Sequence, residues 1–297
     1  SPKSAEDAFK SGLIALGFER EGIFRRSWDE ESITAWLGKN KDPKKRSLAA
    51  DVFVGMVEAS YMRNNWDSLV DKVDAFERVF DGSSVEQRVR MLTGAAYAEL
   101  MDYPKAAGAY EVASGLKGPD ASEALFRLGL TRLNHLKAYE SASKNFEDFS
   151  KKFNKDPKVA DAIYNQALCY YHRYYAGKED QLPQAIRTFE VFYKSNKKHE
   201  LADIAQFYVG QLQHIRKDWK ASIRTLEPLM EAEDPALEQL VFLVGDSYHH
   251  MENWEKSAKY YMQFAKGNER AQNADVALHN AGVAYSNFKK PDLNLAI

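Results

Sequence analysis

Apolar residues recur at intervals of three and four along almost the whole chain, and the strict alternation that is typical of β-strands is absent. This pattern predicts a protein that is nearly all helix. The clearest long helix is predicted over 44–63, where Pro43 can begin a helix but cannot continue one. Shorter helices are predicted over 5–17, 29–38 and 66–80.

Small residues return in the middle of every other predicted helix. They lie 35 to 43 residues apart, at Gly94, Gly129, Ala167, Gly210, Gly245 and Gly282. A period of this size indicates helix pairs that stack on one another. In the first clear pair, Gly94 and Ala106 allow a close helix contact, and the rings of Tyr97 and Tyr110 fill the space around it.

From Val85 onward, this alternation of small and large residues resembles the tetratricopeptide repeat, a family of antiparallel helix pairs. The second repeat shows the same types at Leu125, Gly129, Phe146 and Pro157. The resemblance implies an all-α, right-handed α-solenoid of helix-turn-helix repeats. We predict an irregular helical segment over 1–84, which caps the stack or holds degenerate repeats, and a solenoid over 85–297 whose last repeat is truncated, so that more repeats are expected beyond it.

One stretch resembles a narrower group. The run from Phe146 to Phe153, the Asp156-Pro157 pair and the segment 160–171 are similar to repeats of bacterial cell-envelope proteins, including the outer-membrane-protein assembly lipoprotein and the cell-division coordinator linked to Tol-Pal. This resemblance implies a periplasmic or outer-membrane-associated location. A cytoplasmic location is the alternative, because packing alone makes such repeats alike.

Charge changes this interpretation little. The chain has 41 Lys and Arg residues against 43 Asp and Glu residues, a formal net charge of -2, so no overall field favours nucleic acid or anionic lipid. Its apolar runs are too short for a membrane span. The only cysteine, Cys169, lies in an apolar helical run and is interpreted as a buried packing residue.

In the resembling family, the inner face of the solenoid is lined by fixed positions of each first helix. Carried over to this chain, those positions give a stripe of aromatic and polar side chains. The candidate partner-binding residues are Phe126, Tyr164, Tyr171, Phe207, His214, Phe242, Asp246 and His249. Aromatic rings in a groove can bind a peptide, but neighbouring helices can equally cover the rings as packing, and both interpretations stay open.

Catalytic chemistry finds little support. His249 and His250 are neighbours on a helix and point about 100° apart, so they cannot easily share a metal ion. His214 and His249 occupy equivalent positions of neighbouring repeats, an arrangement that would allow them to face each other. Cys169 and His172 lack an exposed thiolate and an oxyanion site. We therefore expect no enzyme activity, no metal and no cofactor.

The sequence predicts a non-enzymatic adaptor or scaffold that binds a peptide or protein segment in an aromatic-lined groove. No nucleic acid is expected among its partners. Two alternatives remain: a structural subunit of a multi-protein envelope assembly, and a module that positions a catalytic domain from elsewhere in a longer chain. The identity of the partner and the oligomeric state do not follow from the sequence.

Overall fold

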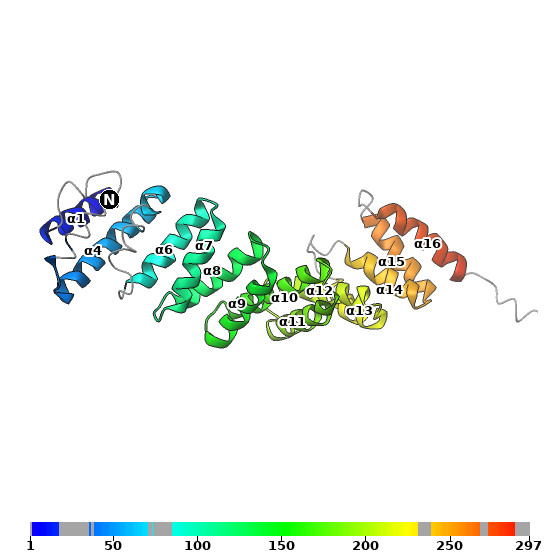
Figure 1. The fold of residues 1–297 in the computed structure, drawn as a ribbon. Coiled ribbons are helices and arrows are strands. Elements are labelled where there is room, and N and C mark those ends of the chain that lie inside the picture. The colour runs from blue at the N-terminus through cyan, green and yellow to red at the C-terminus, as the bar shows by residue number, and fades with distance from the viewer. Residues whose placement is uncertain are drawn as a thin grey trace, which may run out of the picture. The chain divides into compact units, whose positions relative to one another are not determined.

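The computed structural model describes residues 2–17, 36, 39–70, 73, 85–230, 239–267 and 273–288. Within these ranges the regular structure is helical, and no strand occurs. Consecutive helices pack against each other as antiparallel neighbours (Figure 1). The all-α repeat fold expected from the sequence is confirmed. The predicted boundary at 81–84 and most of the predicted helix 29–38 lie outside the described residues.

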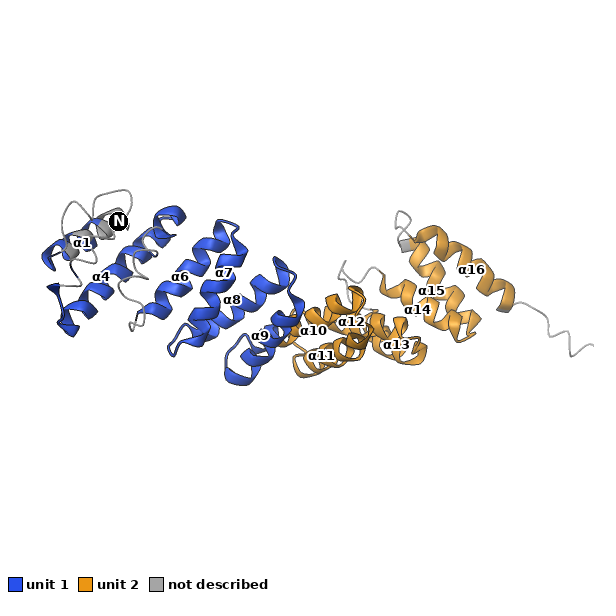
Figure 2. Ribbon diagram, in the orientation of Figure 1, with its two compact units in different colours: residues 1–162 blue, residues 163–297 orange. Residues whose placement is uncertain are grey.

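The helix bounds follow the predicted periodicity. They are α1 Pro2–Ala15, α4 Pro43–Met62, α6 Glu86–Glu99, α7 Tyr103–Gly115, α8 Ala121–Asn134, α9 Tyr139–Lys152, α10 Val159–Tyr175, α11 Leu182–Ser195, α12 Ala202–Ile215, α13 Trp219–Leu226, α14 Leu240–His250, α15 Trp254–Gly267 and α16 Ala274–Phe288, with short 3-10 turns at Glu179–Gln181 and Glu227–Leu229. The chain divides into two compact units, residues 1–162 and 163–297, with the division inside α10 (Figure 2).

Local signals explain where several helices start. Asp42 accepts a hydrogen bond from the backbone N–H of Lys44 at 2.9 Å, and Pro43 occupies the first turn. Asp102 and Asp218 accept equivalent bonds from residues three positions later. A side-chain oxygen in this place satisfies one of the helix N–H groups that has no partner within the helix.

Five helices, α4, α6, α8, α12 and α14, end in similar turns. One residue of each turn is in the left-handed region, with φ between 52° and 64° at Asn64, Met101, Lys137, Lys217 and Glu252. In four of these five turns the next residue is an Asp or Asn, as in Met101-Asp102 and Lys217-Asp218. The turn therefore ends one helix and caps the next within three residues.

The recurring glycines mark the closest helix contacts. A Cβ atom added to Gly94 would lie 2.6 Å from the ring of Tyr110, and one added to Gly129 would lie 2.7 Å from the ring of Phe146. At Gly210 the neighbour is Leu226, at 2.3 Å. In each pair, a large side chain of the second helix therefore occupies the space that a side chain of the first helix would need.

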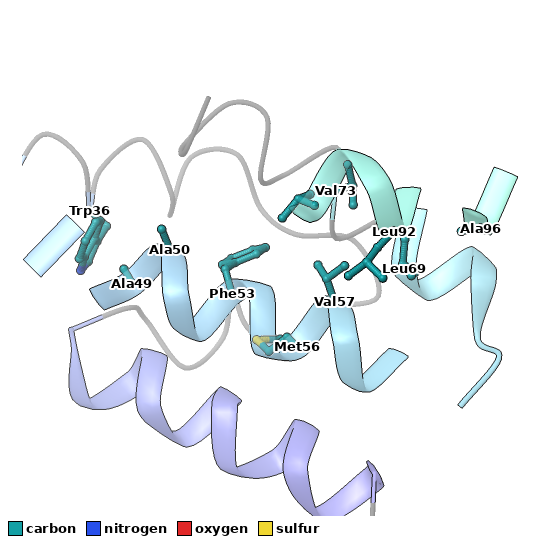
Figure 3. Packing of buried hydrophobic residues seen from close by; sticks show 11 residues of the cluster. Trp36, Ala49, Ala50, Phe53, Met56, Val57, Leu69, Val73, Leu92 and Ala96 are labelled. Atoms are coloured by element: carbon teal, nitrogen blue, oxygen red, sulfur yellow. The ribbon is translucent and has the colours of Figure 1, made fainter. Parts of the chain in front are cut away.

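The N-terminal segment forms a core with the first clear repeat. Trp36, five residues of α4, Leu69, Val73 and three residues of α6 form one buried cluster (Figure 3). Gly55 of α4 also shows the close contact of the later repeats, but its neighbour is Phe9 of α1, the preceding helix, at 2.3 Å from an added Cβ. The close contact of α4 described here is therefore with α1. Most of the predicted helix 66–80 lies outside the described residues.

Candidate protein-interaction surface

Three of the predicted partner-binding rings are largely covered. Phe126 and Tyr164 are each 8% exposed, and Phe207 is 7% exposed. Phe207 lies in a cluster with aliphatic residues of α13 and α14, including Leu226 and Val244. Burial of this degree is typical of core residues, so the packing interpretation is the one that these three side chains support. Contact of these rings with a partner stays a prediction.

The cover comes from the second helix of the same repeat. In three repeats, a ring of the first helix contacts two rings of the second helix at centroid distances of 5.3 to 5.8 Å. The groups are Phe126 with Phe146 and Phe149, Tyr164 with Phe189 and Phe192, and Phe242 with Tyr261 and Phe264. Most of these contacts are edge-to-face, a favourable geometry for aromatic pairs. Phe242 differs because it is only partly buried.

Four tyrosines of α10 and α12 form a second aromatic group, which we call the tyrosine row: Tyr171, Tyr174, Tyr175 and Tyr208. Tyr171 lies 4.7 Å from Tyr175 and 5.0 Å from Tyr208 between ring centroids, and Tyr174 lies 5.2 Å from Tyr175. Tyr175 is 55% exposed, and the other three are partly buried. The side chains of this row are therefore more accessible than those of Phe126, Tyr164 and Phe207.

Polar groups accompany the tyrosine row. The hydroxyl of Tyr171 donates to Oε1 of Gln211 at 3.4 Å, which links α10 to α12. Burial raises the pKa of Tyr171 above its ordinary range, so the phenol stays neutral. Hydroxyl and amide groups at a partly exposed site can donate to a partner's backbone carbonyls or accept from its N–H groups.

His214 of α12 and Asp246 of α14 continue the contacts to the next repeat. Nε2 of His214 lies 2.9 Å from Oδ2 of Asp246, but the ring is not aligned for a hydrogen bond. Burial lowers the pKa of His214, which outweighs the carboxylate beside it, so the ring is neutral at pH 7. The firm bond to Asp246 comes from Tyr261, whose hydroxyl donates to Oδ1 at 2.6 Å.

The pairing of His214 with His249 that their repeat positions allow is not found. His214 faces His250, at 6.5 Å between ring centroids, and His250 stacks on Trp219 at 4.2 Å. His249 instead contacts Trp254 and Tyr261. Adjacent helical residues point in directions about 100° apart, and the Asp246 carboxylate lies one helical turn from His250, so His250 takes the side facing α12.

The first-helix surface of the other unit is charged. Around Phe126, Arg127 donates to Glu123 at 2.6 Å, and Lys158 is ion-paired to the same carboxylate. Lys158 Nζ also lies 5.4 Å from the centre of the Phe126 ring. Burial alone would raise the pKa of Glu123, but the bonds from Lys158 and Arg127 outweigh it and lower that pKa. The carboxylate of Glu123 is therefore ionised at neutral pH.

The described residues include one cysteine, and its surroundings do not favour nucleophilic chemistry. Cys169 is fully buried, and burial raises its pKa to about 12, so the thiol is not ionised at neutral pH. Across the ranges that the structure describes, no group of three or more His, Cys, Asp or Glu side chains could hold a metal ion. None of the helices described there is long and apolar enough to cross a membrane.

Sequence reasoning missed Tyr175, Tyr208, His250 and Trp219. A signal was present for Tyr175, which follows Tyr171 at i+4 and so lies on the same face of a helix that extends to it. Tyr208 follows Phe207 directly. The repeat pattern selects the position of Phe207 and gives no role to the residue after it, so Tyr208 was not predicted. The contacts of His250 and Trp219 depend on side-chain directions that repeat positions alone do not give.

These helix pairs, their glycine-to-ring contacts and their short turns define an all-α solenoid protein of the tetratricopeptide type, as the sequence resemblance implied. No family model matches the chain, and no curated protein sequence matches it. The chain is similar to a solved structure of Naa15/Naa10 bound to HypK-THB, with a TM-score of 0.58 and 14% identity over 98% of this chain. The chain spans 40% of the length of that protein.

Two further solved structures are less similar. One is a tetratricopeptide repeat protein from Parabacteroides merdae, with a TM-score of 0.40 and 15% identity, covering 95% of this chain and 99% of that one. The other is pilF of Pseudomonas aeruginosa, with a TM-score of 0.48 and 14% identity, covering 77% of this chain and 96% of that one. At these identities the likeness concerns the fold and not the partner.

Proposed function

We propose that the protein is a non-enzymatic interaction module that binds a segment of a protein partner along α10, α12 and α14 of residues 163–297. The observation that carries the proposal is the tyrosine row with Gln211, a partly exposed aromatic and polar surface on two neighbouring first helices. Tyrosine supplies a large contact area and a hydrogen-bonding group at a low cost in side-chain entropy.

The predicted site divides into two groups under this proposal. Phe126, Tyr164 and Phe207 are buried and stabilise the packing of the helix pairs. The other five, which are partly exposed, contribute to the binding surface: Tyr171, His214, Phe242, Asp246 and His249. Tyr175, Tyr208 and Gln211 join them.

Affinity purification from native lysate tests this function. The bait is the wild-type chain, compared with a Tyr175→Ala/Gln211→Ala double variant. A matched control is Tyr285→Ala on α16, because Tyr285 is also an exposed tyrosine, at 44%. Circular dichroism of each bait checks that its helices are intact.

The proposal predicts proteins that are captured by the wild type and by Tyr285→Ala, and that are lost from the double variant. Equal capture by all three baits would contradict a role for this surface. A client whose capture survives loss of the tyrosine row would place the interface elsewhere on the molecule.

The location of the protein follows as a separate proposal. The similarity of 146–171 to cell-envelope repeats supports a partner in the periplasm or at the outer membrane. Fractionation of the tagged full-length protein, with markers for each compartment, tests it. Recovery in the cytoplasmic fraction would contradict an envelope role and leave the binding surface unaffected.

A further inference from the structure

The helices that carry the tyrosine row have no charged side chain over most of their length. Residues 162–172 of α10 and 204–215 of α12 include no Asp, Glu, Lys or Arg. Burial lowers the pKa of both His172 and His214, so these rings are neutral at pH 7. Over these two stretches, a charged partner segment would lose its hydration and gain no opposite charge in return. Arg173, between Tyr171 and Tyr174 in the sequence, is a cation at the border of the row.

One carboxylate, that of Asp246 on α14, lies beside His214 of α12. Its Oδ1 accepts from the hydroxyl of Tyr261, and its Oδ2 lies 2.9 Å from Nε2 of His214 and 3.5 Å from Nε2 of His250. The side chain is surrounded by these three groups and is only 21% exposed. The surface therefore favours a partner segment that carries no charge.

The arrangement of the rings further limits the kind of chemical group that a partner can place on this surface. Tyr171 and Tyr175 meet at 51°, Tyr174 and Tyr175 at 74°, and Tyr171 and Tyr208 at 56°. None of these three pairs is stacked face to face, and Tyr175 presents more than half of its surface to solvent. Tilted, exposed rings can receive other flat or cyclic groups between and over them.

We propose that this surface binds an uncharged, proline-rich segment in the polyproline II conformation. The inference rests on the proposed function and names the kind of partner. Pyrrolidine rings pack on tyrosine rings, and the polyproline II helix is formed before binding, so little entropy is lost. Its carbonyls have no internal partners and accept from donors such as the amide of Gln211.

An amphipathic helix suits the surface less well. Such a helix buries an apolar face in an apolar groove, whereas the large apolar rings of these repeats, such as Phe207, are already covered. The accessible groups carry hydroxyls and amides. These groups fit the solvated backbone of an extended segment better than the closed backbone of a helix.

Fluorescence anisotropy with a labelled decaproline peptide tests the inference. Two comparison peptides of the same length are a Gly/Ser repeat and a neutral amphipathic helix former. We expect saturable binding of decaproline to the wild-type chain and none of the Gly/Ser repeat. Tyr175→Ala should weaken decaproline binding about tenfold, whereas Tyr285→Ala should leave it unchanged.

Three results would overturn the inference. If the helix former binds in a manner that depends on Tyr175 and decaproline does not bind, the partner class is wrong and the proposed function stands. If decaproline binds equally to the wild type and to Tyr175→Ala, the tyrosine row is not the site. If no peptide binds in a manner that depends on Tyr175, both the inference and the proposed function fail.

Discussion

Equivalent first helices of the two units offer different surfaces. In residues 1–162, Glu123 and Arg127 of α8 form an ion-paired group with Lys158, which directly precedes α10 and lies beside the buried ring of Phe126. On α10 and α12, in residues 163–297, tyrosine and glutamine side chains stand in the corresponding region without charged neighbours over 162–172 and 204–215. The packing of the repeats is shared, and the chemistry of their surfaces is not.

The difference shows which residues the fold requires and which it leaves free. The ring of Phe126 and the ring of Phe207 both serve packing, whatever surrounds them. The residues one position or one helical turn away are free to be charged or neutral. Partner choice is therefore expected to depend on residues such as Tyr175 and Gln211, and not on the repeat's own pattern.

The largest expected effect tests the shared part of the comparison. Replacing Phe126 or Phe207 with alanine should each lower the free energy of unfolding by about 3 to 5 kcal/mol, because each leaves a cavity among buried side chains. Tyr175→Ala, at an exposed ring, should change it by less than about 0.5 kcal/mol. Urea unfolding followed by circular dichroism measures both. A loss below about 1 kcal/mol at either phenylalanine would show that its ring is not core.

A second test concerns the glycine contacts in both units. Gly129→Ala and Gly210→Ala should each destabilise the protein by about 1 to 3 kcal/mol, because the added methyl group meets Phe146 or Leu226. Gly108→Ala, where no other atom lies within 4 Å, is the matched control. It should stabilise α7 by up to about 1 kcal/mol through helix propensity. The same sign at all three positions would contradict the close-contact account.

Acidification should reduce the stability contributions of His214 and Glu123, one residue from each unit, in different pH ranges. The pKa of His214 is lowered below its ordinary value of 6.5 in the folded state. Its neutral form is therefore favoured, and its contribution to stability is complete above that value and is lost as the pH falls below it. The pKa of Glu123 is lowered below 4.5, so its contribution is lost only as the pH falls below 4.5.

Unfolding of His214→Gln and Glu123→Gln over a pH series measures this difference. His214→Gln should reduce the loss of stability between about pH 7 and pH 5. Glu123→Gln should reduce the loss only below about pH 4.5. The account would be contradicted if His214→Gln increased the loss of stability on acidification, since the histidine would then gain from protonation in the folded state.

The smallest expected effect concerns the turns that both units share. Lys137 and Lys217 have φ values of 52° and 64°, where a side chain costs energy and glycine does not. Lys137→Gly and Lys217→Gly should each stabilise the protein by up to about 1 kcal/mol. A thermal melt compares them with Lys220→Gly, inside α13, which should destabilise by about 1 kcal/mol. Destabilisation at both turn positions would show that the side chain matters more than the backbone there.

Much of the fold was predictable because it depends on local spacing and on small residues. Pro43 predicted a helix start that the structure confirms, and Gly94, Gly129 and Gly210 predicted close helix contacts that it also confirms, whereas Gly282 meets nothing within 4 Å. The close contact of Gly55 with Phe9 was missed because the sequence does not say whether a helix pairs with the one before it or the one after it. The left-handed turns were missed because Lys and Met at those positions give no signal, unlike glycine.

The binding surface was less predictable. Repeat positions identified Phe126 and Phe207 as well as Tyr171, but they could not show which rings the second helix covers. That outcome depends on the size of the side chains facing them, such as Phe146 and Phe149. The contacts of His214 with Asp246 and His250 depend on side-chain directions across two repeats, which spacing alone does not fix.

The salt dependence of binding tests the central claim most directly. The affinity of the wild-type chain for decaproline is measured by titration calorimetry at about 50 mM and about 500 mM NaCl, a range that strongly screens exposed charges. Binding on the stretches 162–172 and 204–215, which contain no Asp, Glu, Lys or Arg, predicts a change of less than about twofold. A fall of about tenfold or more would contradict the account, because it would show that charged residues such as those on α8 provide the interface.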